Sequence, residues 1–239
     1  MERHLSSQFD AELSGISSRV LEMGGMVEAQ MAQAIYALTH FSGETASQVI
    51  TQEARVNVME MDIDRDLSAI IARRQPTARD LRLLIGVSKT IGNLERVGDE
   101  AARIARIVHK LLRASGANRM ASAIGDVQFT GNLALEQLRK ALNALARLDT
   151  ESALEVIHDD RTLDHEFEGQ MRKLVTYMME DPRTISASID MVFVAKAIER
   201  VGDHAKNLAE QVVYIVKGDD IRHTNTVGAA DAAGTETAV

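Results

Sequence analysis

The 239-residue chain contains no cysteine, no tryptophan and only two prolines. Without cysteine, neither a disulfide framework nor a thiolate metal site can form. Aromatic residues make up 3% of the chain, whereas 45% of its residues are hydrophobic, mostly Ala, Leu, Ile, Val and Met. Because the alternating β-branched and aromatic residues of strands are missing, the composition favours helices.

The chain also lacks an excess of positive charge and long hydrophobic runs. Its formal net charge is −8, which argues against a nucleic-acid surface, since such a surface needs clustered Lys and Arg. Residues 1–15 contain no apolar signal-peptide core, and no stretch approaches the roughly 18 uninterrupted apolar residues of a membrane span. We therefore expect a soluble, cytoplasmic protein with no membrane insertion and no nucleic-acid partner.

What the chain does contain is an internal repeat. The pentapeptide Glu-Arg-Val-Gly-Asp occupies residues 95–99 and again residues 199–203, a shift of 104 positions. Upstream, residues 46–57 align with residues 153–164 at a shift of 107 positions. A unit of about one hundred residues is therefore duplicated.

Each unit is expected to form three long helices. Apolar residues recur at helical spacing in the segments 21–38, 49–71, 84–112, 133–148, 156–179 and 191–216. The sequence therefore predicts an all-α fold of two tandem three-helix bundles, residues 1–113 and 114–217. Residues 218–239 lack apolar periodicity and are expected to be a disordered tail. Pro76 and Pro182 are expected to open the third helix of each unit, because proline fits a first helical turn.

Polar pairs spaced four residues apart lie on the second and third expected helices of each unit. This spacing places both members of a pair on one helix face. If those helices are neighbours, the pairs form a first carboxylate cluster of Glu53, Asn57, Glu95 and Asp99, and a second carboxylate cluster of Asp160, Asp164, Glu199 and Asp203. Such oxygen-only sets suit Mg, Mn, Ca or carboxylate-bound Fe. Glu60, one turn further along, is an additional candidate for the first cluster.

A simpler interpretation is that these carboxylates are solvated surface charges. In that case we expect Asp99 to pair with Arg103, and Glu100 with Arg96. The four pairs in matching register favour the cation sites instead. In the second unit His204 replaces Glu100 and Asn207 replaces Arg103, so the ion-pair interpretation loses two of its members there.

With the duplicated unit, the ExxxD pairs and the segments RRQPTARDLR (73–82), TYMMEDPRTI (176–185) and YIVKGDDIRH (214–223), the chain resembles the PhoU family of phosphate-specific transport accessory proteins. The likeness covers about residues 1–223. It implies two three-helix bundles side by side in a cytoplasmic protein that is often a homodimer and has no catalytic chemistry of its own. It also implies a negative regulator of phosphate uptake and of the phosphate regulon, acting as an adaptor between the phosphate ABC transporter ATPase and a phosphate-sensing histidine kinase.

Some members of that family carry iron or other metal clusters on their E/DxxxD motifs. The resemblance therefore implies metal ligands at Glu95, Asp99, Asp160, Asp164, Glu199 and Asp203. Asn57 departs from the pattern, because it is neutral where the motif has Asp. We expect the first cluster to bind a cation more weakly, since charge count controls affinity for hard cations. Mg, Mn and Fe all stay open as the bound metal.

A carboxylate-bridged metalloenzyme of the di-iron helical-bundle type is the alternative function. Such enzymes carry paired Glu-x-x-His motifs that project into the bundle. Glu155 and His158 have that spacing, but Gln48 and Thr51 stand at the matching positions of the first unit. One such motif is insufficient, so the sequence favours the adaptor. A purely structural bundle, whose acidic pairs bind nothing, is the third possibility.

Overall fold

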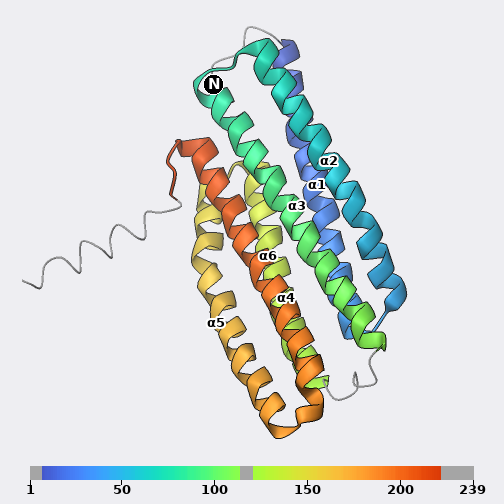
Figure 1. Ribbon diagram of the computed structural model, residues 1–239. Helices are drawn as coiled ribbons and strands as arrows, with labels where there is room; N and C mark the ends of the chain where they lie inside the picture. The colour runs from blue at the N-terminus through green and yellow to red at the C-terminus, as the bar shows by residue number, and fades with distance from the viewer. Residues whose placement is uncertain (1–6, 114–120, 222–239) are drawn as a thin grey trace, which may run out of the picture.

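The computed structural model describes residues 7–113 and 121–221, and all regular secondary structure within them is helical (Figure 1). The elements are α1 (Ser7–Thr39), α2 (Gly43–Arg74), α3 (Ala78–Arg113), α4 (Ala121–Arg147), α5 (Thr150–Glu180), the 3-10 turn η2 (Pro182–Thr184) and α6 (Ile185–Lys217). The predicted all-α bundle fold is confirmed. Most of the predicted tail, residues 222–239, lies outside the described residues.

Several of the described connections between helices are short turns with specific caps. The Ser42 hydroxyl accepts a hydrogen bond from the Thr45 amide at 3.2 Å, and the Asp149 carboxylate accepts from the Glu151 amide at 3.0 Å. Gly218 ends α6 in the left-handed conformation with φ of 85°. Such caps satisfy backbone groups that the helix itself leaves unpaired, so each long helix stops sharply and the next can pack against it.

The prediction that proline opens the third helix of each unit is wrong. Pro76 lies in the connection before Ala78, where α3 begins, and Pro182 begins the turn η2, with α6 starting only at Ile185. In the second case Asp181 caps the turn by accepting a hydrogen bond from the Arg183 amide at 3.0 Å. A proline fits there because the first residues of any helical turn need no backbone donor.

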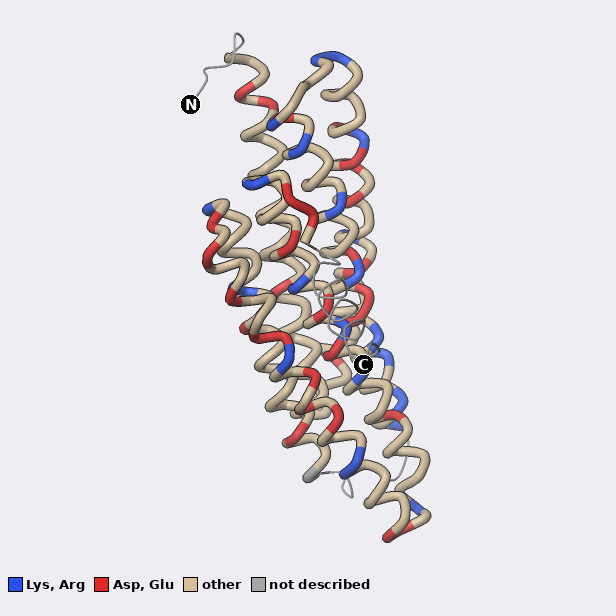
Figure 2. Tube along the Cα trace, turned by 90° about the vertical axis from the view of Figure 1, so that its left-hand side faces the viewer, with Lys and Arg blue, Asp and Glu red and all other residues tan. Residues whose placement is uncertain are grey.

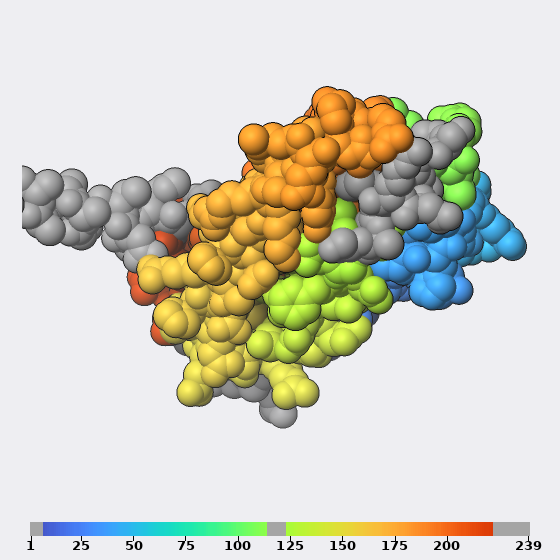
Figure 3. Space-filling model, turned by 90° about the horizontal axis from the view of Figure 1, so that it is seen from below, coloured from blue at the N-terminus to red at the C-terminus, as the bar shows by residue number. Residues whose placement is uncertain are grey.

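The three helices of each unit pack on one another, and the two units lie side by side. Their contact consists of α3 against α6 and α1 against α4 (Figure 1). Seen from below, the second unit (lime to orange) lies beside the first (blue and green) (Figure 3). Buried apolar side chains of all six helices form one cluster across both units. The division into domains at residues 113 and 114 stays a prediction.

The α1–α4 contact reflects the repeat. A Cβ atom at Gly24 would lie 2.6 Å from the Leu142 side chain, and one at Gly131 would lie 3.1 Å from the Ile35 side chain. Gly24 and Gly131 are 107 positions apart, and so are Ile35 and Leu142. Each unit therefore presents a glycine and a large aliphatic residue to the other at equivalent positions, as in a twofold-symmetric interface.

The α3–α6 contact is antiparallel and closely packed. Gly86 near the start of α3 faces Ile215 near the end of α6, whereas Lys110 near the end of α3 pairs with Asp190 near the start of α6. A Cβ atom at Gly86 would lie 2.4 Å from Cγ1 and 2.7 Å from Cδ1 of Ile215. The absence of a side chain at this position therefore sets how closely the two helices approach.

We expect Gly86→Ala to lower the free energy of unfolding, although alanine is the better helix former. Overpacking costs about 1–3 kcal/mol, and the helix propensity returns about 1 kcal/mol, so a net loss of up to about 2 kcal/mol is expected. Ile215 is β-branched and cannot easily rotate away. Gly92→Ala in the same helix is the control, because no atom lies within 4 Å of its Cβ position; it should stabilise the protein. Urea unfolding measures the change in the free energy of unfolding for both variants. A change of the same sign in both would contradict the close packing at Gly86.

Candidate functional site

The structure places the second and third helices of each unit in contact, as the two carboxylate clusters require. In the first cluster, partial burial raises the pKa of Glu95 above its usual value. The nearby carboxylates of Asp99, Glu60 and Glu53 raise that pKa further, while Arg96 opposes them. Glu60 therefore lies within electrostatic range of the cluster, as the sequence suggested.

The second cluster concentrates negative charge more strongly. The pKa of Asp203 is raised to about 6, mainly because the carboxylate is partly desolvated and also because Glu199, Asp160 and Asp164 lie nearby, while Lys196 opposes the shift. The pKa of Asp164 is raised as well, first by burial and then by Asp160 and Glu199. The four carboxylates thus act on one another, and a proton or a cation would relieve their repulsion.

Basic side chains already occupy part of both clusters. In the first, Arg106 pairs with Glu53, while Arg96 lies 3.5 Å from Glu95. In the second, Lys196 pairs with Glu199 at 2.6 Å. The Lys206 ammonium donates a hydrogen bond of 2.8 Å to Asp160, which is 3% exposed and thus more buried than its sequence pattern suggested. Arg96 and Lys196 lie on the same helix as the carboxylates they contact, whereas the Arg106–Glu53 and Lys206–Asp160 pairs span two helices, so no local sequence pattern indicates them.

The ion pairs expected within α3 differ from those observed. Arg96 lies 3.8 Å from Asp99, and Arg103 lies 3.0 Å from Glu100. The predicted Asp99–Arg103 and Glu100–Arg96 pairs are therefore wrong. Glu100 is 6% exposed at its side chain because it faces α6, where Arg200 also reaches it. The contact between α3 and α6 therefore decides which arginine pairs with which carboxylate.

The oxygen donors of both clusters are chemically suited to a hard cation. Asn57 supplies the clearest fit, since its side-chain oxygen is buried and accepts no hydrogen bond from the described residues. As placed, however, no three acidic or histidine side chains in residues 7–113 and 121–221 converge closely enough to hold a metal ion.

Two buried glutamines, which the sequence analysis missed, explain the glycine in the repeated pentapeptide. The Gln30 side-chain amide donates to the carbonyl oxygens of Val49 at 3.1 Å and Gly98 at 3.4 Å. Gln137, 107 positions later, donates to Asp160 at 3.3 Å. A Cβ atom at Gly98 would lie 3.2 Å from the Gln30 side-chain oxygen, and one at Gly202 would lie 3.2 Å from that of Gln137 and closer still to Cδ2 of Leu163. The glycines leave room for these cross-links.

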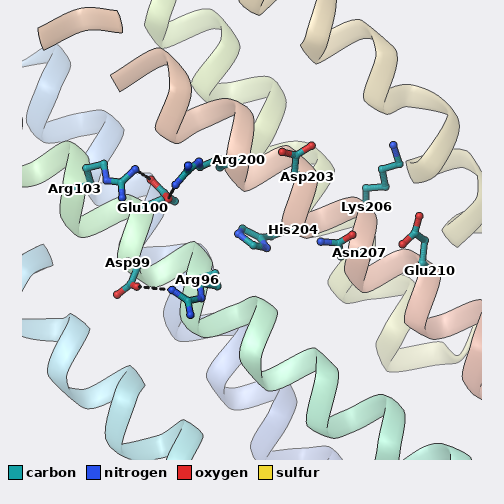
Figure 4. A pocket seen from close by; sticks show the side chains of 10 residues that line it. All are labelled: Arg96, Asp99, Glu100, Arg103, Arg200, Asp203, His204, Lys206, Asn207 and Glu210. Carbon is teal, nitrogen blue, oxygen red and sulfur yellow. Dashed lines mark hydrogen bonds and ion pairs between the residues drawn. The ribbon is translucent and has the colours of Figure 1, made fainter. Parts of the chain in front are cut away.

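A polar pocket of about 660 Å³ lies between α3 and α6, beside both clusters (Figure 4). Its lining includes Arg96, Glu100 and Arg103 of α3 and Arg200, His204 and Asn207 of α6. The Arg200 guanidinium donates to the Glu100 carboxylate at 3.1 Å. Sequence analysis did not predict this pocket, because its two walls are about one hundred residues apart in the chain.

His204 is held at the edge of this pocket by Asn93. The Asn93 side-chain oxygen accepts from the Asn207 amide at 3.2 Å and lies 2.9 Å from Nδ1 of His204. Because a carbonyl oxygen only accepts, Nδ1 of His204 carries the donating proton. Burial lowers the pKa of His204, and the nearby Arg96 and Arg200 lower it further. The imidazole is therefore kept neutral between two cations.

The features expected of a di-iron enzyme are not found at the one matching motif. Glu155 and His158 are both exposed on the surface of α5 rather than projecting into the bundle. Lys and Arg are interspersed with Asp and Glu along the helices in the side view (Figure 2). Within the described residues, no helix combines the length and the apolar character needed to cross a membrane.

Comparisons with known proteins agree with this fold along nearly the whole chain. The family model described as the PhoU domain matches residues 20–108 and again residues 129–212, one match in each unit. The phosphate-specific transport system accessory protein PhoU homolog of Burkholderia sp is 45% identical over 223 residues, covering 93% of this chain and 94% of that protein. The phosphate-specific transport system accessory protein PhoU of Escherichia coli (strain K12) is 42% identical, covering 93% and 91%.

Solved structures give the same result. The crystal structure of PhoU from Pseudomonas aeruginosa superposes with a TM-score of 0.79 at 41% identity, covering 88% of this chain and 100% of that chain. A second PhoU crystal structure, from Streptococcus pneumoniae, shares the fold with a TM-score of 0.80 at 24% identity. These relatives are named as accessory proteins of phosphate transport and not as enzymes. With matches in both of its repeated units, this chain belongs to the PhoU family.

Proposed function

We propose that this protein is a cytoplasmic negative regulator of phosphate uptake and of the phosphate regulon. It acts as a signalling adaptor between the ATPase of the phosphate ABC transporter and a phosphate-sensing histidine kinase. The observation that carries the proposal is the 45% identity, over 93% of the chain, to a protein named for its accessory role in phosphate-specific transport. The alternative role, a di-iron enzyme, is not supported, because Glu155 and His158 are exposed on α5 instead of facing the bundle interior.

The shape and surface of the molecule support an adaptor. Six long helices present extended faces, which suits contact with large partners rather than enclosure of a small substrate. Apolar side chains are exposed around the α5–α6 corner, among them Met179 at 80% exposure, Ile189 and Phe193. Exposed apolar groups of this size commonly mark protein contacts. A homodimer or a partner protein would cover them.

We further propose that the two carboxylate clusters bind Mn, Mg or Fe ions. Glu53, Asn57, Glu95 and Asp99 would hold one ion, and Asp160, Asp164, Glu199 and Asp203 the other. The buried Asn57 oxygen and the raised pKa values of Glu95, Asp164 and Asp203 support cation binding. Binding requires side-chain rotation, with Arg106, Lys196 and Lys206 leaving the carboxylates they now contact. The metal would supply positive charge that ties two helices together, with no reaction needed.

Deleting the gene in its own organism should raise expression from phosphate-regulon promoters in phosphate-rich medium. The physical reason is that the adaptor would no longer transmit the phosphate-replete state from the transporter to the kinase. A promoter–reporter assay, with the gene restored on a plasmid as the control, measures the change. Unchanged reporter activity in the deletion strain would count decisively against the proposed role.

The two clusters should bind metal unequally. The second has four carboxylates and the first has three with Asn57, so a divalent cation should fill the second cluster first. Asp203→Asn is therefore expected to lower metal content more than Asp99→Asn, the equivalent change in the other repeat. Mass-spectrometric metal counts on both variants after equal Mn²⁺ loading test this. Equal losses would refute the asymmetry, and no bound metal in the unmodified protein would refute the sites.

Without metal, Asp203→Asn should stabilise the protein in a pH-dependent way. The folded carboxyl has a pKa of about 6 against 3.8 for the ordinary value. The group favours the folded state at low pH, and this contribution is lost as the pH rises from about 4 to about 6. The asparagine variant avoids that loss, so its stability relative to wild type should grow through this interval and then level off.

Urea unfolding in EDTA at several pH values measures this difference. Glu22→Gln, an exposed position of α1 outside both clusters, is the control for losing one negative charge. A difference between Asp203→Asn and wild type that stays constant from pH 4 to pH 7 would contradict the crowding of charge in the second cluster. Adding Mn²⁺ should reverse the order of stability, because only the wild type keeps the full ligand set.

A further inference from the structure

Three arginines from two helices converge at the centre of the α3–α6 pocket. Arg96, Arg103 and Arg200 all border it, and Glu100 is the carboxylate between them (Figure 4). Glu100 lies 3.0 Å from Arg103 and 3.1 Å from Arg200, so two guanidinium groups share one carboxylate. Asp99 also lines the pocket, 3.8 Å from Arg96, so three guanidinium groups face two carboxylates in this part of the pocket.

Arg96 is the least committed of the three arginines. Its closest carboxylates are Glu95 at 3.5 Å and Asp99 at 3.8 Å, distances longer than charged hydrogen bonds. Its side chain is 65% exposed, which lets the guanidinium group turn toward an incoming ligand. His204 is neutral and lies near both Arg96 and Arg200, so it adds no charge of its own.

The remaining charged side chains of the lining are Asp203, Lys206 and Glu210 of α6. Asp203 and Lys206 point away from α3, whereas His204 points toward it (Figure 4). Lys206 pairs with Asp160 of α5 at 2.8 Å, and Asp203 interacts with Glu199, Asp160 and Asp164. Over the whole lining, four basic side chains balance four acidic ones, so an anion would be held by the free N–H donors of the arginines and not by a net positive charge.

We propose that this pocket binds a small multivalent oxyanion through Arg96, Arg103 and Arg200. The planar guanidinium fork matches the paired oxygens of a phosphate or sulfate group, and each fork has N–H donors beyond the one that faces Glu100. The volume of about 660 Å³ accommodates a single phosphate or a short oligophosphate. The site joins helices of both repeats, so an anion would tie the two units together. It does not depend on the proposed regulatory role or on a bound metal.

Isothermal titration calorimetry in low-salt buffer tests the proposal, with phosphate, sulfate and tripolyphosphate as separate probes. The full chain is purified without these anions, and EDTA is present throughout so that no anion binds through a metal. We expect saturable binding of at least one probe, weakened by added NaCl. Binding of phosphate and sulfate alike would mean that the pocket recognises one tetrahedral group, whereas binding of tripolyphosphate alone would mean that it needs several. Both results support the site, provided that the variants below lose the binding.

Arg96→Gln should weaken binding about tenfold, the effect of losing one charged hydrogen bond. Arg96→Lys keeps the positive charge but not the planar guanidinium fork. Its affinity should lie between that of the wild type and that of Arg96→Gln. Arg65→Gln is the matched control, since that arginine is 74% exposed on α2 and pairs only within its own helix, with Asp62; it should change the affinity less than about twofold. Circular dichroism melts confirm that each variant is folded.

Three results would overturn the proposal. The first is no binding of any probe to the wild-type protein at low salt. The second is an equal loss of affinity in Arg96→Gln and Arg65→Gln, which would mean attraction to overall charge. The third is binding that occurs only when Mn²⁺ replaces EDTA, which would place the anion on a metal in a carboxylate cluster.

Discussion

The close antiparallel packing of α3 against α6 is the constraint on which the rest of the structure depends. Each of these helices is buried against its own unit and also against the other unit. Only narrow strips of their surfaces are left for polar side chains. One strip of α3 faces α2 and carries Glu95 and Asp99, and another faces α6 and carries Arg96, Glu100 and Arg103. The carboxylate clusters and the pocket are therefore neighbours by necessity.

Small residues make this packing possible, and they do so in both repeats. Gly24 and Gly131 admit large side chains across the α1–α4 contact, while Gly98 and Gly202 leave room for Gln30 and Gln137. Each glycine costs helix stability relative to alanine, by about 1 kcal/mol. The close approach offsets that cost through burial and through hydrogen bonds from the glutamines to the backbone of neighbouring helices. The glycine of the repeated pentapeptide thus has a packing role, which does not depend on whether the Glu and Asp of the same pentapeptide bind a cation.

Duplication gave the two units the same framework but not the same chemistry. His204 and Asn207 stand where the first unit has Glu100 and Arg103, so the middle of the α3–α6 contact is asymmetric. Arg103 and Arg200 converge on Glu100, whereas His204 and Asn207 converge on Asn93. The carboxylate clusters differ as well, since Asn57 corresponds to Asp164. An approximately symmetric scaffold therefore presents two electrostatically different halves.

The sequence by itself determined the helical fold, the repeat and the position of the paired carboxylates beside the buried seam. These follow from local spacing, because apolar residues at three- and four-residue intervals define one face of a helix and the motif residues take fixed places relative to it. Only the tertiary structure decided which cations meet those carboxylates. Arg106 reaches Glu53, and Lys206 reaches Asp160, across distances of 53 and 46 residues in the chain. The pocket between Arg96, Arg103 and Arg200 was likewise decided by the tertiary structure, because α3 and α6 come together only when two complete bundles pack, and no local pattern records that contact.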